Sequence, residues 1–197
     1  MTKPGAALRI IVVEPDAERA HQVVDALRGA DDFDVTVIGD SSALSRRVVE
    51  LDPDVVLIDI ANPSRDSLEE LTIAAAPTER AVAMFVDRSD DAMTTTAVEA
   101  GISAYVVDGL RPERIKPVLD AAIARFKMVS RMRRELEATK AALAERKTID
   151  RAKGLLMAAR GIGEDEAYTL LRRTAMDQGK RIAEVAAAIV TAAELLK

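Results

Sequence analysis

Basic residues recur along the last quarter of the sequence, and their side chains are the ones best suited to binding chemistry. Six of them fall within one short segment: Arg151, Lys153, Arg172, Arg173, Lys180 and Arg181. An arginine guanidinium offers a fork of donors for phosphate and a flat face for stacking on unpaired bases. Gly154, beside Lys153, leaves space for a backbone or a base to come close. The segment predicts contact with a polyanion such as a nucleic acid, and the alternative is ordinary surface charge.

Three short helices are expected to carry these residues, because Gly161, Gly163 and Gly179 interrupt the segment and glycine ends helices readily. Each piece has an apolar face at helical spacing. These faces comprise Ile149, Ala152, Leu155, Leu156 and Ala159, then Ala167, Leu170, Leu171 and Thr174, then Ile182, Val185, Ala186 and Ile189. The third helix is expected from about Lys180, and Tyr168 is expected in the core. Residues 147–197 thus predict a small three-helix bundle, which needs a partner or an adjoining helix for stability.

The net charge of −5 conceals a separation of charge along the chain. Residues 1–124 carry 12 Lys and Arg against 23 Asp and Glu, residues 125–143 carry 6 against 2, and residues 144–197 carry 10 against 8. An acidic front and a basic rear favour binding of a polyanion at the rear.

Three runs of residues in the rear segment carry a family resemblance. They are RAKGLLM (Arg151–Met157), EDEAYTLLRRTAM (Glu164–Met176) and IAEVA (Ile182–Ala186). Together they resemble the ANTAR domain, an RNA-binding three-helix module of bacterial antitermination regulators. The resemblance covers roughly the last quarter of the chain and implies a leader mRNA as partner, bound by Gly154 and the six basic residues of this segment.

The front of the chain alternates apolar runs with amphipathic helices. Strands are expected at Leu8–Val13, Asp34–Ile38, Val55–Ile58, Ala81–Val86 and Ala104–Val107. Helices are expected at Ala17–Leu27, Ser42–Glu50, Leu68–Ala75 and Asp90–Ala100, with a further one starting at Arg111. Runs that are apolar throughout are typical of parallel strands buried on both faces. Residues 1–124 therefore predict an α/β domain with a doubly wound, five-stranded parallel sheet.

This order of elements, with acidic residues after the first strand and Asp59 after the third, resembles the receiver domain of response regulators. In that family the carboxyl ends of these strands gather acids around Mg²⁺ and a phosphate-accepting aspartate. The resemblance implies that Asp59 stands at the acceptor position, in an acidic pocket with Glu14, Asp16 and Asp108. Mg²⁺ is expected only for a functional site, held by Glu14, Asp16 and Asp59.

Three positions depart from the receiver pattern. Pro15 stands where a Mg²⁺-binding carboxylate is expected, Val86 replaces a hydroxyl residue, and Asp108 replaces a lysine. Each change removes a ligand or a positive charge from a site built for a phosphoryl group. We therefore expect a pseudo-receiver with an inactive Asp59 and no cofactor, controlled by another protein. A conventional regulator activated by phosphorylation of Asp59 is the alternative.

A linking helix is expected over residues 112–146, overlapping the last helix of the front domain. The residues of one seam step by three and four, with one irregular step at Val129 to Met132, and all but Thr139 are apolar: Leu119, Ala122, Phe126, Val129, Met132, Leu136, Thr139 and Leu143. This heptad-like spacing predicts a homodimeric coiled coil. The alternative is one helix packed back on its own domain.

The segment AYVVDGLRPERI (Ala104–Ile115) resembles the nitrate-assimilation antiterminators, the NasT-like type of ANTAR response regulators. This finer resemblance implies a sensor protein, responding to nitrate or nitrite, that holds the regulator inactive. On release the regulator would bind paired hairpin loops in a leader mRNA and prevent formation of a terminator.

Other classes of function are less well supported by the residues. A DNA-binding helix-turn-helix stays open, although the third helix offers few side chains to read bases beyond Glu184. An enzyme is not expected, since His21 is the only histidine, there is no cysteine, and no glycine-rich phosphate loop occurs. No apolar run reaches the about 20 residues that span a bilayer. We expect a cytoplasmic protein without a membrane partner.

Overall fold

The computed structural model describes residues 7–30, 33–40 and 44–195. The chain divides into two compact units, Met1–Arg131 and Met132–Lys197, which are described in turn. Within the described ranges, no helix is both long and apolar enough to cross a membrane.

The first unit is built on a five-stranded sheet in which all neighbouring strands pair in parallel. Its order is β2-β1-β3-β4-β5. The strands are β1 (Leu8–Val13), β2 (Phe33–Ile38), β3 (Val55–Ile60), β4 (Ala81–Val86) and β5 (Ala104–Val107). All five predicted strands are confirmed, with β2 one residue and β3 two residues longer than expected.

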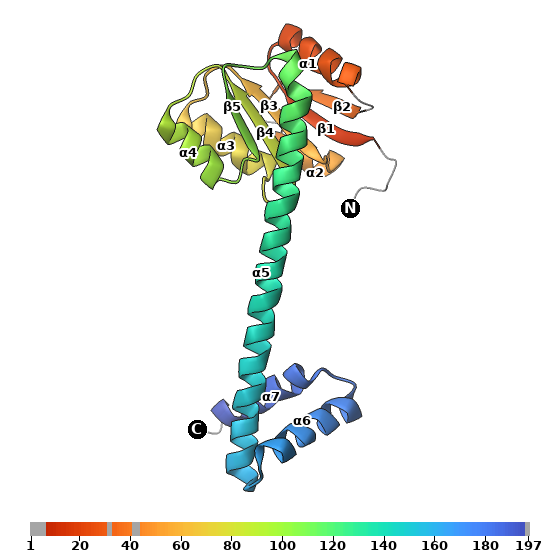
Figure 1. Ribbon diagram of the computed structural model, residues 1–197, viewed down its shortest axis with the longest axis vertical. Coiled ribbons are helices and arrows are strands. Elements are labelled where there is room, and N and C mark those ends of the chain that lie inside the picture. The colour runs from red at the N-terminus through yellow and green to blue at the C-terminus, as the bar shows by residue number, and fades with distance from the viewer. Residues whose placement is uncertain (1–6, 31–32, 41–43, 196–197) are drawn as a thin grey trace. The chain divides into compact units, whose positions relative to one another are not determined.

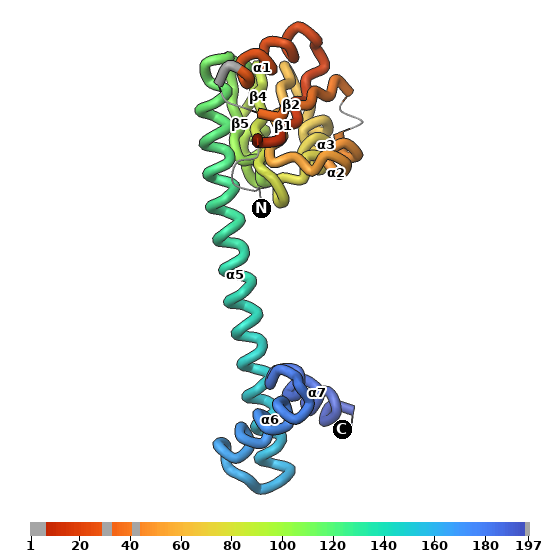
Figure 2. Tube along the Cα trace, turned by 90° about the vertical axis from the view of Figure 1, so that its right-hand side faces the viewer, coloured from red at the N-terminus to blue at the C-terminus, as the bar shows by residue number. Residues whose placement is uncertain are grey.

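Helices cover both faces of this sheet (Figure 1). They are α1 (Ala17–Ala30), α2 (Leu44–Leu51), α3 (Arg65–Ala75), α4 (Asp91–Glu99) and the first turns of α5 (Pro112–Arg160). In Figure 2 the first turns of α5 lie on the opposite side of the sheet from α2 and α3. The predicted doubly wound receiver-like fold is thus confirmed. The predicted start of the second helix, Ser42, lies outside the described residues.

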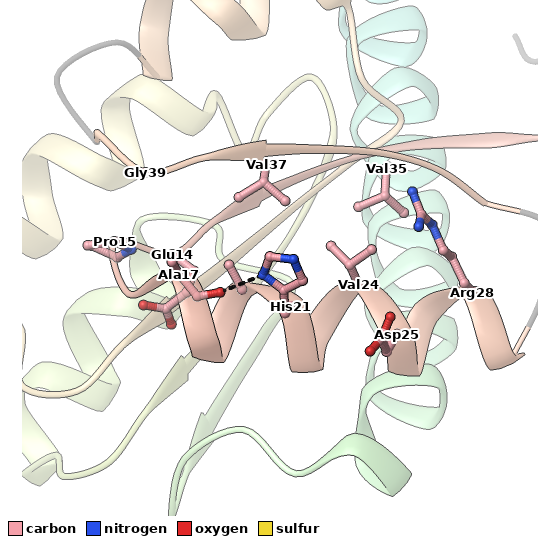
Figure 3. Close-up of a pocket in the computed structure, with 11 residues that line it drawn as sticks. Glu14, Pro15, Ala17, His21, Val24, Asp25, Arg28, Val35, Val37 and Gly39 are labelled. Atoms are coloured by element: carbon pink, nitrogen blue, oxygen red, sulfur yellow. Dashed lines mark hydrogen bonds between the residues drawn. The ribbon is translucent and has the colours of Figure 1, made fainter.

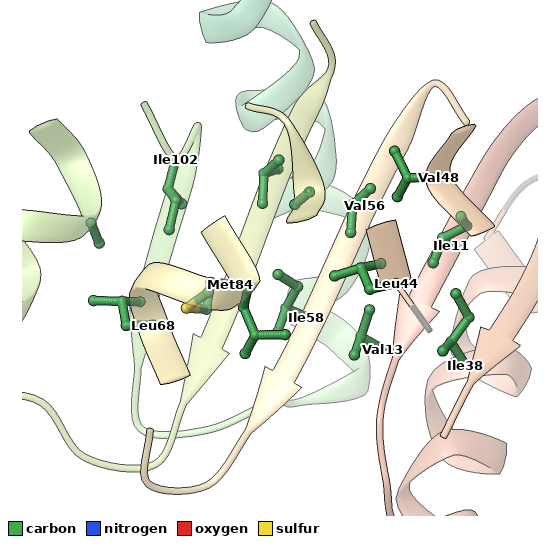
Figure 4. Packing of buried hydrophobic residues seen from close by; sticks show 14 of the residues in the cluster. Ile11, Val13, Ile38, Leu44, Val48, Val56, Ile58, Leu68, Met84 and Ile102 are labelled. Carbon is green, nitrogen blue, oxygen red and sulfur yellow. The ribbon is translucent and has the colours of Figure 1, made fainter. Parts of the chain in front are cut away.

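Alternation of side chains along the strands gives the unit two apolar cores. Ile10 and Val12 of β1 face α1 and α5. Ile11 and Val13 face α2, α3 and α4, in the cluster that Figure 4 shows. The strands β3 and β4 are buried on both faces almost throughout, because they lie in the interior of the sheet. This leaves the carboxyl ends of the strands as the polar edge of the domain.

The heptad-like apolar residues of α5 divide into two groups. Leu119 and Ala122 are 1% and 0% exposed in the core against the sheet, and Phe126 packs beside them. The next four apolar residues are 42–58% exposed: Val129, Met132, Leu136 and Leu143. The prediction of one continuous coiled-coil seam was therefore wrong at its start. At the start of α5 the alternative holds instead: these residues pack against their own domain and bury one apolar face of the sheet.

The second unit is a three-helix bundle of the last turns of α5 with α6 (Glu164–Gln178) and α7 (Ile182–Leu195). Gly161 and Gly179 adopt positive φ angles of 67° and 62° at the two breaks, a backbone conformation that favours glycine. The core consists of Ala152, Leu171, Ala175, Val185 and Ala186, with Ile149, Leu156, Ile182, Ile189 and Val190 packed around it. The predicted bundle is confirmed. Two details differ, since Ala159 is exposed and the third helix begins at Ile182.

Candidate acceptor pocket and candidate RNA-binding surface

Asp59 and Glu14 lie close together at the carboxyl edge of the sheet. Asp59 belongs to the end of β3, and Glu14 directly follows the neighbouring strand β1. Their side chains are 1% and 4% exposed. Two buried carboxylates in one place need a counter-charge, because an uncompensated buried charge is costly.

Arg19 of α1 supplies that counter-charge. Its Nη2 lies 2.8 Å from Oδ1 and 2.9 Å from Oδ2 of Asp59, and its Nε lies 3.2 Å from Oδ2. The guanidinium also lies 3.4 Å from Oε2 of Glu14 and 3.6 Å from Oδ1 of Asp87. Three carboxylates from the ends of three adjacent strands thus share one guanidinium, which is well suited to forked contacts.

The environment shifts the pKa of two of these groups. Burial, together with the hydrogen bond and charge of Asp59, raises the pKa of Glu14 to about 7, while the Asp16 N–H and Arg19 act in the other direction. Burial tends to lower the pKa of Arg19, but its hydrogen bonds to Asp59 and the surrounding acids raise it. Glu14 accepts a hydrogen bond at Oε1 from the Asp16 N–H at 2.8 Å. Its buried Oε2 has no hydrogen-bond partner among the described residues.

The two other acids predicted for the pocket have different positions. Asp16 is exposed, and its Oδ1 accepts hydrogen bonds from the N–H groups of Glu18 and Arg19, which caps the start of α1. Asp108 lines the mouth of a cavity of about 290 Å³ with Arg19, Asp59 and Asp87, but it is exposed there and has a φ of 78°. The acids that contact the Arg19 guanidinium are therefore Glu14, Asp59 and Asp87, while Asp16 contacts only the Arg19 backbone N–H.

Sequence reasoning missed Arg19 and Asp87. Asp87 directly follows β4, and this position at the carboxyl edge could have indicated it. Gly109 makes its placement possible, because a Cβ at residue 109 would lie 2.8 Å from Oδ1 of Asp87. No spacing in the sequence signals that Arg19 turns from α1 toward the sheet edge.

The residues at this edge do not fit a Mg²⁺ ion. In the described part of the chain, no group of three His, Cys, Asp or Glu side chains is arranged to hold a metal. The space between the three carboxylates holds the Arg19 guanidinium, and Asp16 is occupied by capping α1. At the end of β4, Val86 is fully buried and offers no hydroxyl to a phosphoryl oxygen.

A second hollow of the first unit, about 410 Å³, lies between α1 and β2 (Figure 3). Val24, Val35 and Val37 make much of its wall apolar, and His21 lies among them. The His21 Nδ1 lies 2.9 Å from the Ala17 carbonyl oxygen of the same helix. This contact engages the imidazole within α1 and gives no arrangement of base and nucleophile.

Half of the six predicted RNA-binding cations of the second unit form ion pairs. Arg151 pairs with Glu194 at 2.8 Å, and Arg181 pairs with Glu145 at 3.0 Å. Lys153 has a side chain only 15% exposed and lies 2.7 Å from both Asp150 and Glu164. The hydrogen bond to Asp150, and after it in size the hydrogen bond to Glu164, raises the pKa of Lys153. Lys153 therefore connects α5 to the start of α6, which is a structural role.

The other three cations, Arg172, Arg173 and Lys180, are exposed. None of them forms an ion pair with another described residue. Around Gly154 the surface is open, since a Cβ there would meet nothing within 4 Å.

An exposed row runs along α6 beside these arginines. Tyr168 and Met176 are 43% and 72% exposed and lie four residues either side of Arg172, so the three share one helix face. The expectation that Tyr168 belongs to the core was therefore wrong. The buried side of α6 consists of Ala167, Leu171 and Ala175. We call Tyr168, Arg172, Arg173 and Met176 the α6 row. It places an aromatic ring, two guanidinium groups and a thioether on the exposed surface of one helix.

Comparison with known proteins agrees with this division into two parts. Residues 137–190 match the model of the ANTAR domain. The chain is 27% identical over 180 residues to the transcriptional regulatory protein PdtaR of Mycobacterium tuberculosis, covering 90% of this chain and 88% of the relative. It is 30% identical over 117 residues to the DNA-binding response regulator MtrA of Mycolicibacterium smegmatis, covering 59% of this chain and about half of the relative, 51%.

Solved structures support the fold of the first unit. The CheY-like receiver domain of Methanospirillum hungatei matches with a TM-score of 0.54 and 16% identity, over 62% of this chain and 98% of that one. A response regulator from Thermotoga maritima matches with a TM-score of 0.53 and 18% identity, over 60% and 99%. The chain is thus similar to response regulators in two respects: its first unit has the fold of receiver domains, and residues 137–190 match the ANTAR domain.

Proposed function

We propose that the chain is an RNA-binding antitermination regulator, which binds hairpin loops in a leader mRNA and prevents formation of a terminator. The observation that carries this proposal is the α6 row, Tyr168, Arg172, Arg173 and Met176, exposed on the ANTAR domain. Unpaired loop bases stack on aromatic rings and guanidinium planes, and phosphates accept from arginine forks. The α6 row offers both kinds of contact on a single helix.

Within the basic segment, the residues divide into two roles under this proposal. Arg172, Arg173 and Lys180 contact RNA directly, since no carboxylate of the described chain competes for them. Arg151 and Arg181 are 57% and 72% exposed, so their ion pairs can exchange for phosphate at little cost. Lys153 supports the junction of α5 and α6 and contributes to RNA binding through the shape of the bundle.

Duplex DNA is the alternative nucleic acid, and the third helix argues against it. A recognition helix needs polar side chains that reach base edges in the major groove. The exposed positions of α7 include Ala187, Ala188 and Ala192, with Glu184, Thr191 and Glu194 as the polar exceptions. None of these three supplies the bidentate cationic or amide contacts that give most sequence readout.

Control through the first unit is proposed to come from a bound sensor protein rather than from phosphoryl transfer. The contact of Arg19 with Asp59, the buried Val86 and the acidic Asp108 all disfavour a phosphoryl group at Asp59. The conventional alternative, activation by phosphorylation of Asp59, needs a site in which positive groups outweigh the carboxylates around the phosphoryl group. The nitrate-assimilation assignment rests on the Ala104–Ile115 segment alone and is part of the proposal.

Sequencing the RNA that crosslinks to the full chain in its host tests this function. The proposal predicts enrichment of leader transcripts that contain two adjacent hairpins upstream of a terminator. Leaders of nitrate and nitrite genes would support the finer assignment, and other leaders would replace it. Recovery of no RNA above an uncrosslinked control, or of promoter DNA instead, would contradict the proposal.

A further inference from the structure

The Arg19 side chain lies among the carboxylates at the carboxyl edge of the sheet. Receiver-fold proteins are expected to gather acids around a divalent cation at this edge of the sheet. In this chain the side chain of Arg19 reaches the same place from α1, with contacts to Asp59 at 2.8, 2.9 and 3.2 Å. We propose that the Arg19 guanidinium is a built-in cation that takes the place of a divalent metal ion and keeps metal ions away from Asp59.

The contacts of Arg19 resemble those of a bound cation in sign of charge and in the number of carboxylates reached. One positive group touches three carboxylates, those of Glu14, Asp59 and Asp87, which follow or end β1, β3 and β4. Nη2 donates to both oxygens of Asp59, so a metal ion at this carboxylate would have to compete with the guanidinium. The contact is partly sheltered, since the Arg19 side chain is 34% exposed and the Asp59 side chain only 1%.

Neighbouring residues help to hold the Arg19 side chain at this place. Two successive N–H groups at the start of α1, those of Glu18 and Arg19, donate to Asp16, which fixes the first turn from which the Arg19 side chain leaves. Asp16, a potential metal ligand by sequence, is thereby withdrawn from the pocket. On the other side, the absence of a side chain at Gly109 gives Asp87 the space to approach the guanidinium.

A built-in cation has two consequences for the unit. It links α1 to the ends of β3 and β4, so the carboxylates at that edge have a cationic partner without any ligand. It also makes that edge independent of Mg²⁺ and of small phosphoryl donors, which need the metal to neutralise the transferring group. Signals must therefore reach the unit by another route, such as binding of a protein.

Metal binding by the full chain tests this inference. Free Mn²⁺ is measured by electron paramagnetic resonance in titrations of wild type, Arg19→Gln and Arg19→Gln with Asp59→Asn. Arg19→Gln removes the counter-charge of Glu14, Asp59 and Asp87 and lets these carboxylates rearrange around a cation, so this variant is expected to bind one Mn²⁺ roughly tenfold more tightly than wild type. The added Asp59→Asn change is expected to abolish that gain. Arg28→Ala removes another arginine of α1 and is expected to behave as wild type.

The same titrations can overturn the inference. Equal Mn²⁺ binding by wild type and Arg19→Gln, whether tight or absent, would show that Arg19 does not take the place of a metal ion. Arg19→Lys keeps a cation and is expected to exclude Mn²⁺ as wild type does, so tight binding by Arg19→Lys would contradict the proposed role of charge. If Arg19→Gln is unfolded without metal, refolding on addition of Mn²⁺ supports the inference, and failure to refold contradicts it.

Discussion

Arg19 and Asp59 form a forked contact, with the guanidinium Nη2 2.8 Å from Oδ1 and 2.9 Å from Oδ2 of the carboxylate. The contact joins helix α1 to the end of the strand that carries the acceptor position of receiver domains. Both carboxylate oxygens accept from the guanidinium, so the charge of Asp59 is paired within the chain. The unit therefore has the fold of a receiver domain, but we expect it to lack the phosphoryl chemistry of that fold.

The first prediction concerns phosphorylation of Asp59. Incubating the full chain with acetyl phosphate and Mg²⁺ is expected to give little adduct, because Asp59 is paired with Arg19 and no hydroxyl or lysine replaces the missing donors at Val86 and Asp108. Intact mass spectrometry measures the fraction modified, with Asp59→Asn as the control for adducts elsewhere. A stable, near-stoichiometric adduct that Asp59→Asn removes would contradict the pseudo-receiver interpretation.

The second prediction concerns pH and Glu14. Its pKa rises from 4.5 to about 7 on folding, so the folded state holds a proton that the unfolded state has lost. The stability that Glu14 contributes is fully present below pH 4.5 and is lost as the pH rises toward 7. Above that window the deprotonated carboxylate destabilises the first unit by about 1–3 kcal/mol. Glu14→Gln should therefore raise the melting temperature more at pH 8 than at pH 5.

Thermal melts of wild type and Glu14→Gln at the two pH values measure this difference. Glu18→Gln removes an exposed acid of α1 and serves as the control for general loss of charge. If Glu14→Gln has the same effect at pH 5 and pH 8, the pKa of Glu14 is not raised by folding.

Much of the front domain could be predicted from its sequence, because strands buried on both faces appear as continuous apolar runs such as Leu8–Val13 and Ala81–Val86. The sites were less predictable. The apolar spacing of α5 is the same for Leu119, which packs on the sheet, and for Leu136, which is exposed, so periodicity alone could not separate them. The position of Arg19 depends on how α1 crosses the sheet edge, which no local pattern encodes.

The third prediction concerns assembly through α5. Val129, Met132, Leu136 and Leu143 keep spacings of three, four and seven residues and are 42–58% exposed, so a second copy of α5 is the expected partner. Val129→Glu places a charge in that seam and should shift a dimer toward monomer in sedimentation velocity. Ala141→Glu puts the same charge on the opposite side of the helix and should leave the dimer intact. Equal sedimentation of the two variants would mean that these residues are not a dimer seam.

The fourth prediction concerns Gly154 in the interior of α5. A Cβ there meets no atom within 4 Å, so Gly154→Ala should stabilise the second unit by about 0.5–1 kcal/mol through helix propensity. If RNA approaches closely at this point, the same methyl group should weaken RNA binding despite the added stability. Melting and RNA titration of one preparation measure both effects. Stabilisation with unchanged affinity would remove Gly154 from the RNA contact.

The most direct test of the central claim is the affinity of the full chain for a two-hairpin leader RNA over a series of salt concentrations. Arg172→Ala with Arg173→Ala is expected to weaken binding and to reduce the slope of log affinity against log salt by about 1–2, since phosphate contacts release counterions. Arg46→Ala with Arg47→Ala removes the same charge from α2 and should change neither quantity. An unchanged affinity and slope in the α6 variant would contradict the account.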